Sequence, residues 1–253
     1  MYKKVPTILI IFKYQDVLTE YMGQQDWYRK TSWSENIEKE FYERFNRSKG
    51  AFHKAQYLRI QATILIDTSK LPNIHKGIQL LVLLADKYPD EASLSSAYLE
   101  LAQAYYYLKD WNKSEKYFKL SIETQKKFPN NRTNAVILYC QYILERNLTK
   151  KFNDALRMAE LYEKEQPIYL AHDDFLINSV KAIVYDFKKD SEKSKSFAIK
   201  AHNAANRTDS GFKYHKSYGL VKNKNSFLYR KIETIIKKES FIDKIISRIR
   251  LSR

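Results

Sequence analysis

The sequence predicts an all-α fold organised as internal repeats. The 253 residues include only five glycines and five prolines, whereas a protein of many short strands needs such residues at most of its tight turns. Pro89, Pro129 and Pro167 close similar segments at spacings of 40 and 38 residues. Because proline lacks a backbone donor and disfavours a helical residue before it, each one indicates the end of a helix.

Residues 1–51 are expected to form amino-terminal capping helices, over 14–30 and 32–49. Ser32 or Ser34 is a suitable N-cap for the second helix, and Glu35 and Glu38 complement the helix dipole in its first turns. Aromatic residues near helical spacing are expected to pack on the next helix rather than to hold a ligand. These residues are Trp33, Phe41, Tyr42 and Phe45.

The segment between Pro89 and Pro129 has a specific pattern of large and small residues. The first half contains Tyr98, Leu101, Ala102 and Tyr105, and the second half contains Trp111, Ser114, Phe118 and Ser121. This pattern resembles the tetratricopeptide repeat, whose units pair two antiparallel helices over about 34 residues. The resemblance implies a right-handed α-solenoid of about four divergent units over 52–208. Lys109 departs from it, because the family usually has glycine in that turn.

Small residues recur where the two helices of each unit should touch. A side chain no larger than Ala or Ser allows close approach of paired helices. In the first and third units the turn between helices is expected to be three residues longer than in the others. This register makes Cys140 a small core residue rather than a reactive thiol. The small positions are Ala62, Ala102, Cys140 and Ala182 on first helices, and Gly77, Ser114, Ala155 and Ser194 on second helices.

Residues 209–253 are expected to form a loop followed by a basic amphipathic helix. The apolar face of this helix favours a carboxy-terminal cap over the last repeat, with partner binding or self-association, membrane-surface contact and nucleic-acid contact as alternatives. Its apolar residues are Leu228, Ile232, Ile235, Ile236, Ile242, Ile245, Ile246 and Ile249, and its cations are Arg230, Lys231, Lys237, Lys238, Lys244, Arg248 and Arg250.

Positive charge is concentrated at the carboxy-terminal end. The chain has 45 basic and 29 acidic residues and a formal net charge of +16, and residues 186–253 alone hold 18 basic and 7 acidic residues. Such a field attracts phosphate backbones, anionic lipids or acidic proteins. In residues 210–219, around His215, aromatic and basic residues alternate in an expected loop, a pattern that can stack bases and pair with phosphates.

The sequence shows no catalytic signature, and we expect neither an enzyme nor a bound metal or cofactor. The histidines are dispersed, without the paired spacing of a helical metal site, and no glycine-rich loop could cradle phosphates. His172-Asp173-Asp174 is interpreted as the start of a helix, where carboxylates complement the dipole. The apolar runs are too short to span a membrane, and a single cysteine favours a reducing, cytoplasmic location. The histidines are His53, His75, His172, His202 and His215.

The resemblance implies a non-catalytic scaffold or adaptor that binds a peptide or protein on a concave face lined by first helices. Amides, hydroxyls and one arginine among apolar residues suit an extended peptide backbone. Two alternatives remain open: a nucleic-acid-binding or regulatory protein acting through the basic tail, and a dedicated inhibitor of one partner protein. The candidate partner-binding residues are Gln56, Arg59, Thr63, Ser96, Leu99, Gln103, Tyr107, Asn134, Ile137, Gln141, Leu176, Ser179 and Ile183.

Overall fold

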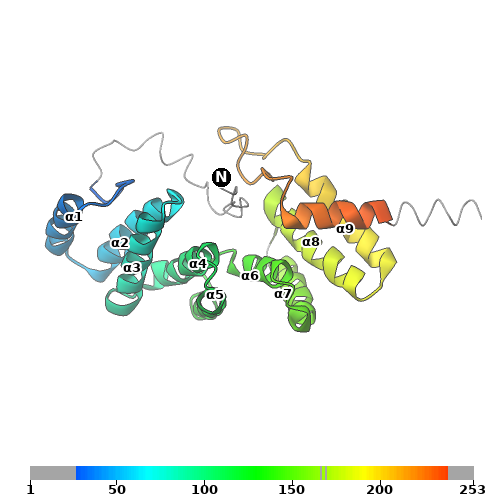
Figure 1. The fold of residues 1–253 in the computed structure, drawn as a ribbon, viewed down its shortest axis with the longest axis horizontal. Helices are drawn as coiled ribbons and strands as arrows, with labels where there is room; N and C mark the ends of the chain where they lie inside the picture. The colour runs from blue at the N-terminus through cyan, green and yellow to red at the C-terminus, as the bar shows by residue number, and fades with distance from the viewer. Residues whose placement is uncertain (1–26, 166, 169, 239–253) are drawn as a thin grey trace, which may run out of the picture. The chain divides into compact units, whose positions relative to one another are not determined.

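The computed structural model describes residues 27–238 except residues 166 and 169, and within this part of the chain helices are the only regular secondary structure (Figure 1). The all-α prediction is therefore confirmed for these residues. The expected helix over 14–30 lies mostly outside them, and its described end, residues 27–30, is turn and coil. The helices are α1 (Glu35–Arg47), α2 (Ala51–Asp67), α3 (Leu71–Lys87), α4 (Glu91–Tyr107), α5 (Trp111–Lys127), α6 (Ala135–Glu145), α7 (Phe152–Glu165), α8 (Ala171–Phe187) and α9 (Ser191–Ala205), followed by a helix over residues 227–238.

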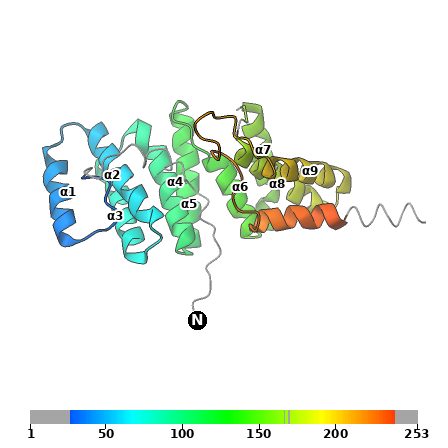
Figure 2. The same cartoon turned by 90° about the horizontal axis from the view of Figure 1, so that it is seen from above.

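Consecutive helices pack in pairs, as a helical repeat requires. Helix α2 packs against α3, α4 against α5, and α8 against α9, which lie side by side in both views (Figures 1 and 2). The chain divides into two compact units, and the boundary falls between Ala135 and Val136. We call the described residues up to 135 the N-terminal unit and those from 136 the C-terminal unit. In the N-terminal unit, α4 also contacts α2 and α3, so that successive pairs share one core.

The predicted small-residue register is confirmed in all four pairs. Ser114 Oγ donates to the Ala102 carbonyl at 2.8 Å, and Ser194 Oγ donates to the Ala182 carbonyl at 3.0 Å. Cys140 Sγ donates to the Ala155 carbonyl at 3.4 Å. A Cβ placed on Gly77 would lie 2.8 Å from the Ala62 carbonyl oxygen. The paired helices therefore approach closely at these points because no larger side chain separates them.

One expected detail of the first pair is wrong. The loop between α2 and α3 has the same length, residues 68–70, as the loops 108–110 and 188–190 of the second and fourth pairs. The three additional residues lie inside α3, which starts one turn earlier relative to its small residue and has Pro72 in its first turn. Proline is favourable there because the first N–H groups of a helix have no partner within it. The third pair does have a longer connection, residues 146–151, which ends in a 3₁₀ helix (Thr149–Lys151).

Each turn between paired helices contains one residue in the left-handed region. The residues are Ser69, Lys109, Asn147 and Lys189, with φ between 50° and 63°. After α4, the Lys109 N–H donates to the Tyr106 carbonyl at 3.0 Å and the Asp110 N–H donates to the Tyr105 carbonyl at 2.9 Å, which closes the helix end in the manner of a Schellman motif. Lys109 thus adopts the conformation for which glycine is the usual residue.

Replacing Lys189 by glycine is expected to raise the free energy of unfolding by about 1 kcal/mol, because glycine removes the steric cost of a side chain at positive φ. Lys188 provides a matched control, since it is an exposed neighbour with φ of −77°. Lys188→Gly should give no gain, and denaturant unfolding of both variants measures the difference. Equal effects of the two substitutions would contradict the assigned turn conformation.

Helix α1 packs on the first pair through its aromatic face, as expected. Ser34 is the N-cap, and its Oγ accepts from the Ile37 N–H. Phe41 and Phe45 are buried in the shared core, and Trp33 packs edge-on against Phe41. Trp33 Nε1 also donates to Glu38 Oε2 at 3.0 Å. The aromatic residues therefore serve packing, and Ser34 rather than Ser32 begins the helix.

The helix over 227–238 buries its apolar face in the C-terminal unit. Leu228, Ile232 and Ile235 are buried. The centres of the Tyr229 ring and of the Phe175 ring on α8 are 6.4 Å apart. Lys238 Nζ lies 3.1 Å from Oδ1 of Asp186, which is near the end of α8. The helix is thus packed against α8. Of the predicted tail cations, Lys244, Arg248 and Arg250 lie outside the described residues, as do Ile242, Ile245, Ile246 and Ile249.

Candidate functional site

The candidate binding residues divide between buried and partly exposed positions. Leu99, Ile137, Leu176 and Ser179 are buried. These four were expected on an open face, but their helices turn them into the packed interior, so they contribute to the core. The remaining nine keep part of their surface accessible: Gln56, Arg59, Thr63, Ser96, Gln103, Tyr107, Asn134, Gln141 and Ile183.

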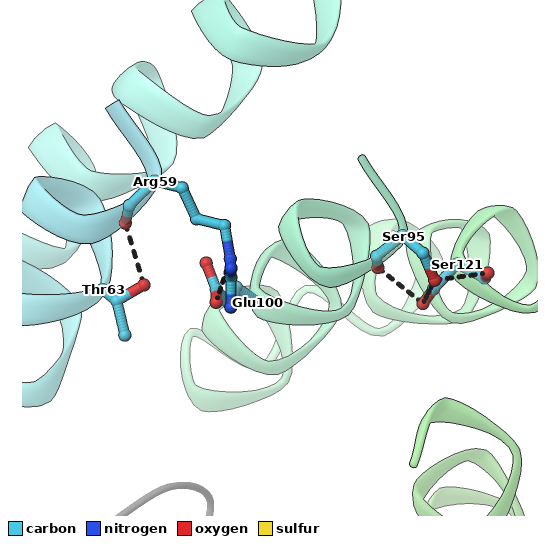
Figure 3. A network of polar contacts seen from close by, with 5 residues as sticks. All are labelled: Arg59, Thr63, Ser95, Glu100 and Ser121. Carbon is cyan, nitrogen blue, oxygen red and sulfur yellow. Dashed lines mark hydrogen bonds and ion pairs between the residues drawn. The ribbon is translucent and has the colours of Figure 1, made fainter. Parts of the chain in front are cut away.

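In the N-terminal unit, the first helices α2 and α4 bring polar side chains together (Figure 3). Arg59 Nε donates to Glu100 Oε1 at 3.0 Å, and Thr63 Oγ1 donates to the carbonyl of Arg59 at 2.9 Å. The Glu100 residue is 8% exposed, whereas the Arg59 side chain is more than one third exposed. A buried carboxylate thus faces a guanidinium that reaches the surface.

Two buried polar atoms of α4 have no hydrogen-bond partner. They are Glu100 Oε2 and Gln103 Nε2, neither of which is accessible to solvent. The two residues are three positions apart, so their side chains lie on neighbouring turns of one helix face. A buried donor or acceptor without a partner costs about 1–3 kcal/mol. Both atoms therefore lie unpaired in the interior at a cost to stability, and a ligand reaches them only when neighbouring side chains move aside.

Electrostatics in this cluster favour protonation of its carboxyl groups. Burial raises the pKa of Glu100, and the nearby Arg59 guanidinium acts in the opposite direction. Burial also raises the pKa of Asp67, one turn beyond Thr63 on α2, to about 7, and the negative charge of Glu100 adds to this shift. Both carboxyl groups are therefore harder to ionise than exposed ones.

Glu100 and Asp67 were missed by the sequence analysis, which placed Leu99 on the α4 face. The polar residues Ser96, Glu100, Gln103 and Tyr107 recur at spacings of four, three and four, and this periodicity could have identified the face. On α2, the candidates Gln56, Arg59 and Thr63 are followed four residues later by Asp67, which the same periodicity would have added. On α4 the error is a single position, Leu99 in place of Glu100.

The corresponding part of the C-terminal unit is apolar. If Ala182 is aligned with Ala102, Glu100 corresponds to Val180 and Gln103 corresponds to Ile183. Val180 is fully buried. The unpaired acceptor and donor of α4 therefore have no counterpart at the equivalent positions of α8.

The candidates for chemistry other than binding occupy structural positions. Cys140 is buried and burial raises its pKa to about 12, so the thiol is a core residue as predicted. Asp173 and Asp174 lie in the first turn of α8, where carboxylates complement the dipole, and His172 Nδ1 is 3.3 Å from Asp173 Oδ1. No cluster of three or more His, Cys, Asp or Glu side chains suited to a metal occurs in the described residues.

The described helices include none with the length and apolar character needed to cross a bilayer. The four described tail cations, Arg230, Lys231, Lys237 and Lys238, are exposed. Lys237 pairs with Glu233 and Lys238 pairs with Asp186.

Comparison of the chain with models of protein families, with curated proteins and with solved structures finds no match.

Proposed function

We propose that this protein is a non-catalytic scaffold or adaptor that binds an extended segment of another protein at the α2–α4 face. The observation that carries the proposal is the pair of buried atoms without partners, Glu100 Oε2 and Gln103 Nε2. A peptide backbone provides the complementary groups, because its N–H can donate to the carboxylate and its carbonyl can accept from the amide. Because neither atom is accessible in the unbound protein, neighbouring side chains must move aside as the partner binds, and the partner then removes the cost of leaving both atoms unpaired.

The surroundings of these atoms support contact with a peptide. The guanidinium of Arg59 uses its Nε for Glu100, and the side chain reaches the surface, where its remaining donors suit carbonyl or carboxylate oxygens. Gln56, Ser96 and Tyr107 are partly exposed on the same two helices. The relationship to tetratricopeptide repeats, a right-handed superhelix, capping at both ends and a cytoplasmic location are part of the same proposal.

Selection from a display library of random peptides tests the proposal. The full chain is the target, and each selected peptide is then titrated against the wild-type protein and against Gln103→Leu. We expect an affinity loss of about tenfold, because a ligand carbonyl loses its donor in a buried setting.

Gln79→Leu serves as the control, since Gln79 is an exposed glutamine on α3, away from the α2–α4 face. This substitution should leave the affinity unchanged. Selected peptides that bind Gln103→Leu as tightly as the wild type would contradict the proposed site.

A further inference from the structure

The loop that follows α9 displays aromatic rings and cations to solvent. Tyr214 is 80% exposed and Phe212 is 43% exposed, and Lys213 and Lys216 beside them are exposed as well. Large aromatic side chains usually contribute to a core or an interface, so a ring this exposed in a folded unit indicates a contact surface.

Specific hydrogen bonds fix the shape of this loop. Ser210 Oγ donates to the His215 carbonyl at 2.8 Å and accepts from the Phe212 N–H at 3.1 Å. At the end of the loop, the His172 N–H at the start of α8 donates to the Gly219 carbonyl at 2.7 Å. Gly219 has φ of 67° and lies so close to Leu170 that a Cβ would be 2.5 Å from its side chain. The rings are thus presented by a structured loop anchored to the unit.

The charge around the loop is strongly positive. Residues 186–238 contain 14 basic and 5 acidic residues. Lys213 Nζ lies 5.3 Å from the centre of the Tyr214 ring, so that this ring has a cation directly beside it. On the helix that follows, Arg230 and Lys231 are exposed. Anionic groups are therefore attracted to the same region in which the rings are exposed.

We propose that this loop, residues 209–219, binds single-stranded nucleic acid. Bases would stack on Tyr214 and Phe212, while Lys213 and Lys216 pair with the phosphates. Every base offers a flat face for stacking, and a backbone of phosphates supplies the negative charge. Single strands fit better than duplexes because the bases of a duplex are stacked on each other and cannot reach the rings. This function is separate from peptide binding on α2 and α4.

Fluorescence anisotropy with a labelled oligothymidylate and a duplex of the same length tests the proposal on the full chain. We expect tighter binding of the single strand and a decrease in affinity of about tenfold for Tyr214→Ala, the effect of losing one stacked base. Lys213→Glu with Lys216→Glu should weaken binding and reduce the slope of log affinity against log salt concentration by roughly 0.7 for each lysine–phosphate ion pair that the substitutions remove.

Lys126→Glu with Lys127→Glu is the matched control, because both lysines are exposed at the end of α5 in the other unit. This variant has the same net charge as the loop variant and should bind almost as tightly as the wild type. Circular dichroism verifies that all variants are folded. Any of four results would overturn the proposal. These are equal affinity for duplex and single strand, undiminished binding by Tyr214→Ala, equal losses of affinity from both lysine double substitutions, and binding only to phosphatidylserine vesicles.

Discussion

Replacing Asp67 by asparagine is expected to raise the free energy of unfolding by about 1–3 kcal/mol near pH 8 and to have little effect near pH 4. In the folded protein, burial and Glu100 raise the pKa of Asp67 to about 7, whereas an ordinary aspartate has a value of 3.8. Well below pH 4, both states hold the proton. As the pH rises from about 4 to 7, the unfolded chain loses its proton first, so ionisation favours unfolding. The amide carries no charge and avoids this cost.

Urea unfolding of wild type and variant across this pH range measures the effect. Asp86→Asn is the matched control, because Asp86 lies near the end of α3 just as Asp67 ends α2, but it is exposed. Both substitutions remove a carboxylate from the negative end of a helix dipole, so only the additional gain of Asp67→Asn reports burial. A gain that is the same at pH 4 and pH 8 would contradict the assigned environment.

Replacing Gly77 by leucine is expected to lower the free energy of unfolding by about 3 kcal/mol, through overpacking between α2 and α3. A single Cβ at this position would lie 2.7 Å from Ile66 Cγ1 and 2.8 Å from the Ala62 carbonyl oxygen. The backbone of α2 cannot move aside as a flexible side chain could, so the two helices must separate. The better helix propensity of leucine offsets less than about 1 kcal/mol of this cost.

Gln79→Leu places the same side chain two residues further along α3, on its exposed surface. Its effect on stability should remain within about 0.5 kcal/mol. Thermal and denaturant unfolding of the two variants give the comparison. Equal free energies of unfolding for Gly77→Leu and Gln79→Leu would contradict the close approach of α2 and α3 at Gly77.

The pairing of helices could be predicted from the sequence because it depends on residue size at a regular spacing. Ala102 and Ser114 occupy equivalent places to Ala182 and Ser194, and both pairs are joined by the same type of hydrogen bond. The start of α3 could not be predicted in this way. The extra turn depends on the residue at which α3 begins. The spacing of small residues alone does not distinguish a longer loop from a longer helix.

A second repeated pattern explains why two of the turns are alike. Lys-Asp-x-x-Lys-Ser occurs at 109–114 and again at 189–194. In both copies the aspartate accepts a hydrogen bond from the backbone N–H three residues later, at 3.1 Å, and pairs with the lysine of that residue. The pattern was visible in the sequence, and its interpretation as an N-cap preceded by a left-handed lysine would have explained why Lys109 stands where the family usually has glycine.

The polar cluster on α2 and α4 was predicted only in part, because its most buried residue, Glu100, has the sequence surroundings of an exposed one. A glutamate surrounded by Leu99 and Leu101 suggests an exposed position of an amphipathic helix, since buried carboxylates are rare. Its burial depends on α2, whose Arg59 lies 41 positions away in the chain and supplies the partner. Arg59, Thr63 and Gln103 were predicted because they are polar residues on first helices, a property that the sequence shows directly.

The double substitution Glu100→Leu with Gln103→Leu tests the central claim, that these two side chains are retained for a ligand rather than for folding. Calorimetric unfolding and titration of a selected peptide are measured on the same preparation. The account predicts a higher melting temperature, because two buried atoms without partners are removed and the partly exposed Arg59 side chain, which loses its ion pair, is solvated, together with loss of peptide binding. A lower melting temperature with unchanged binding would show that the two side chains stabilise the fold and do not form the site.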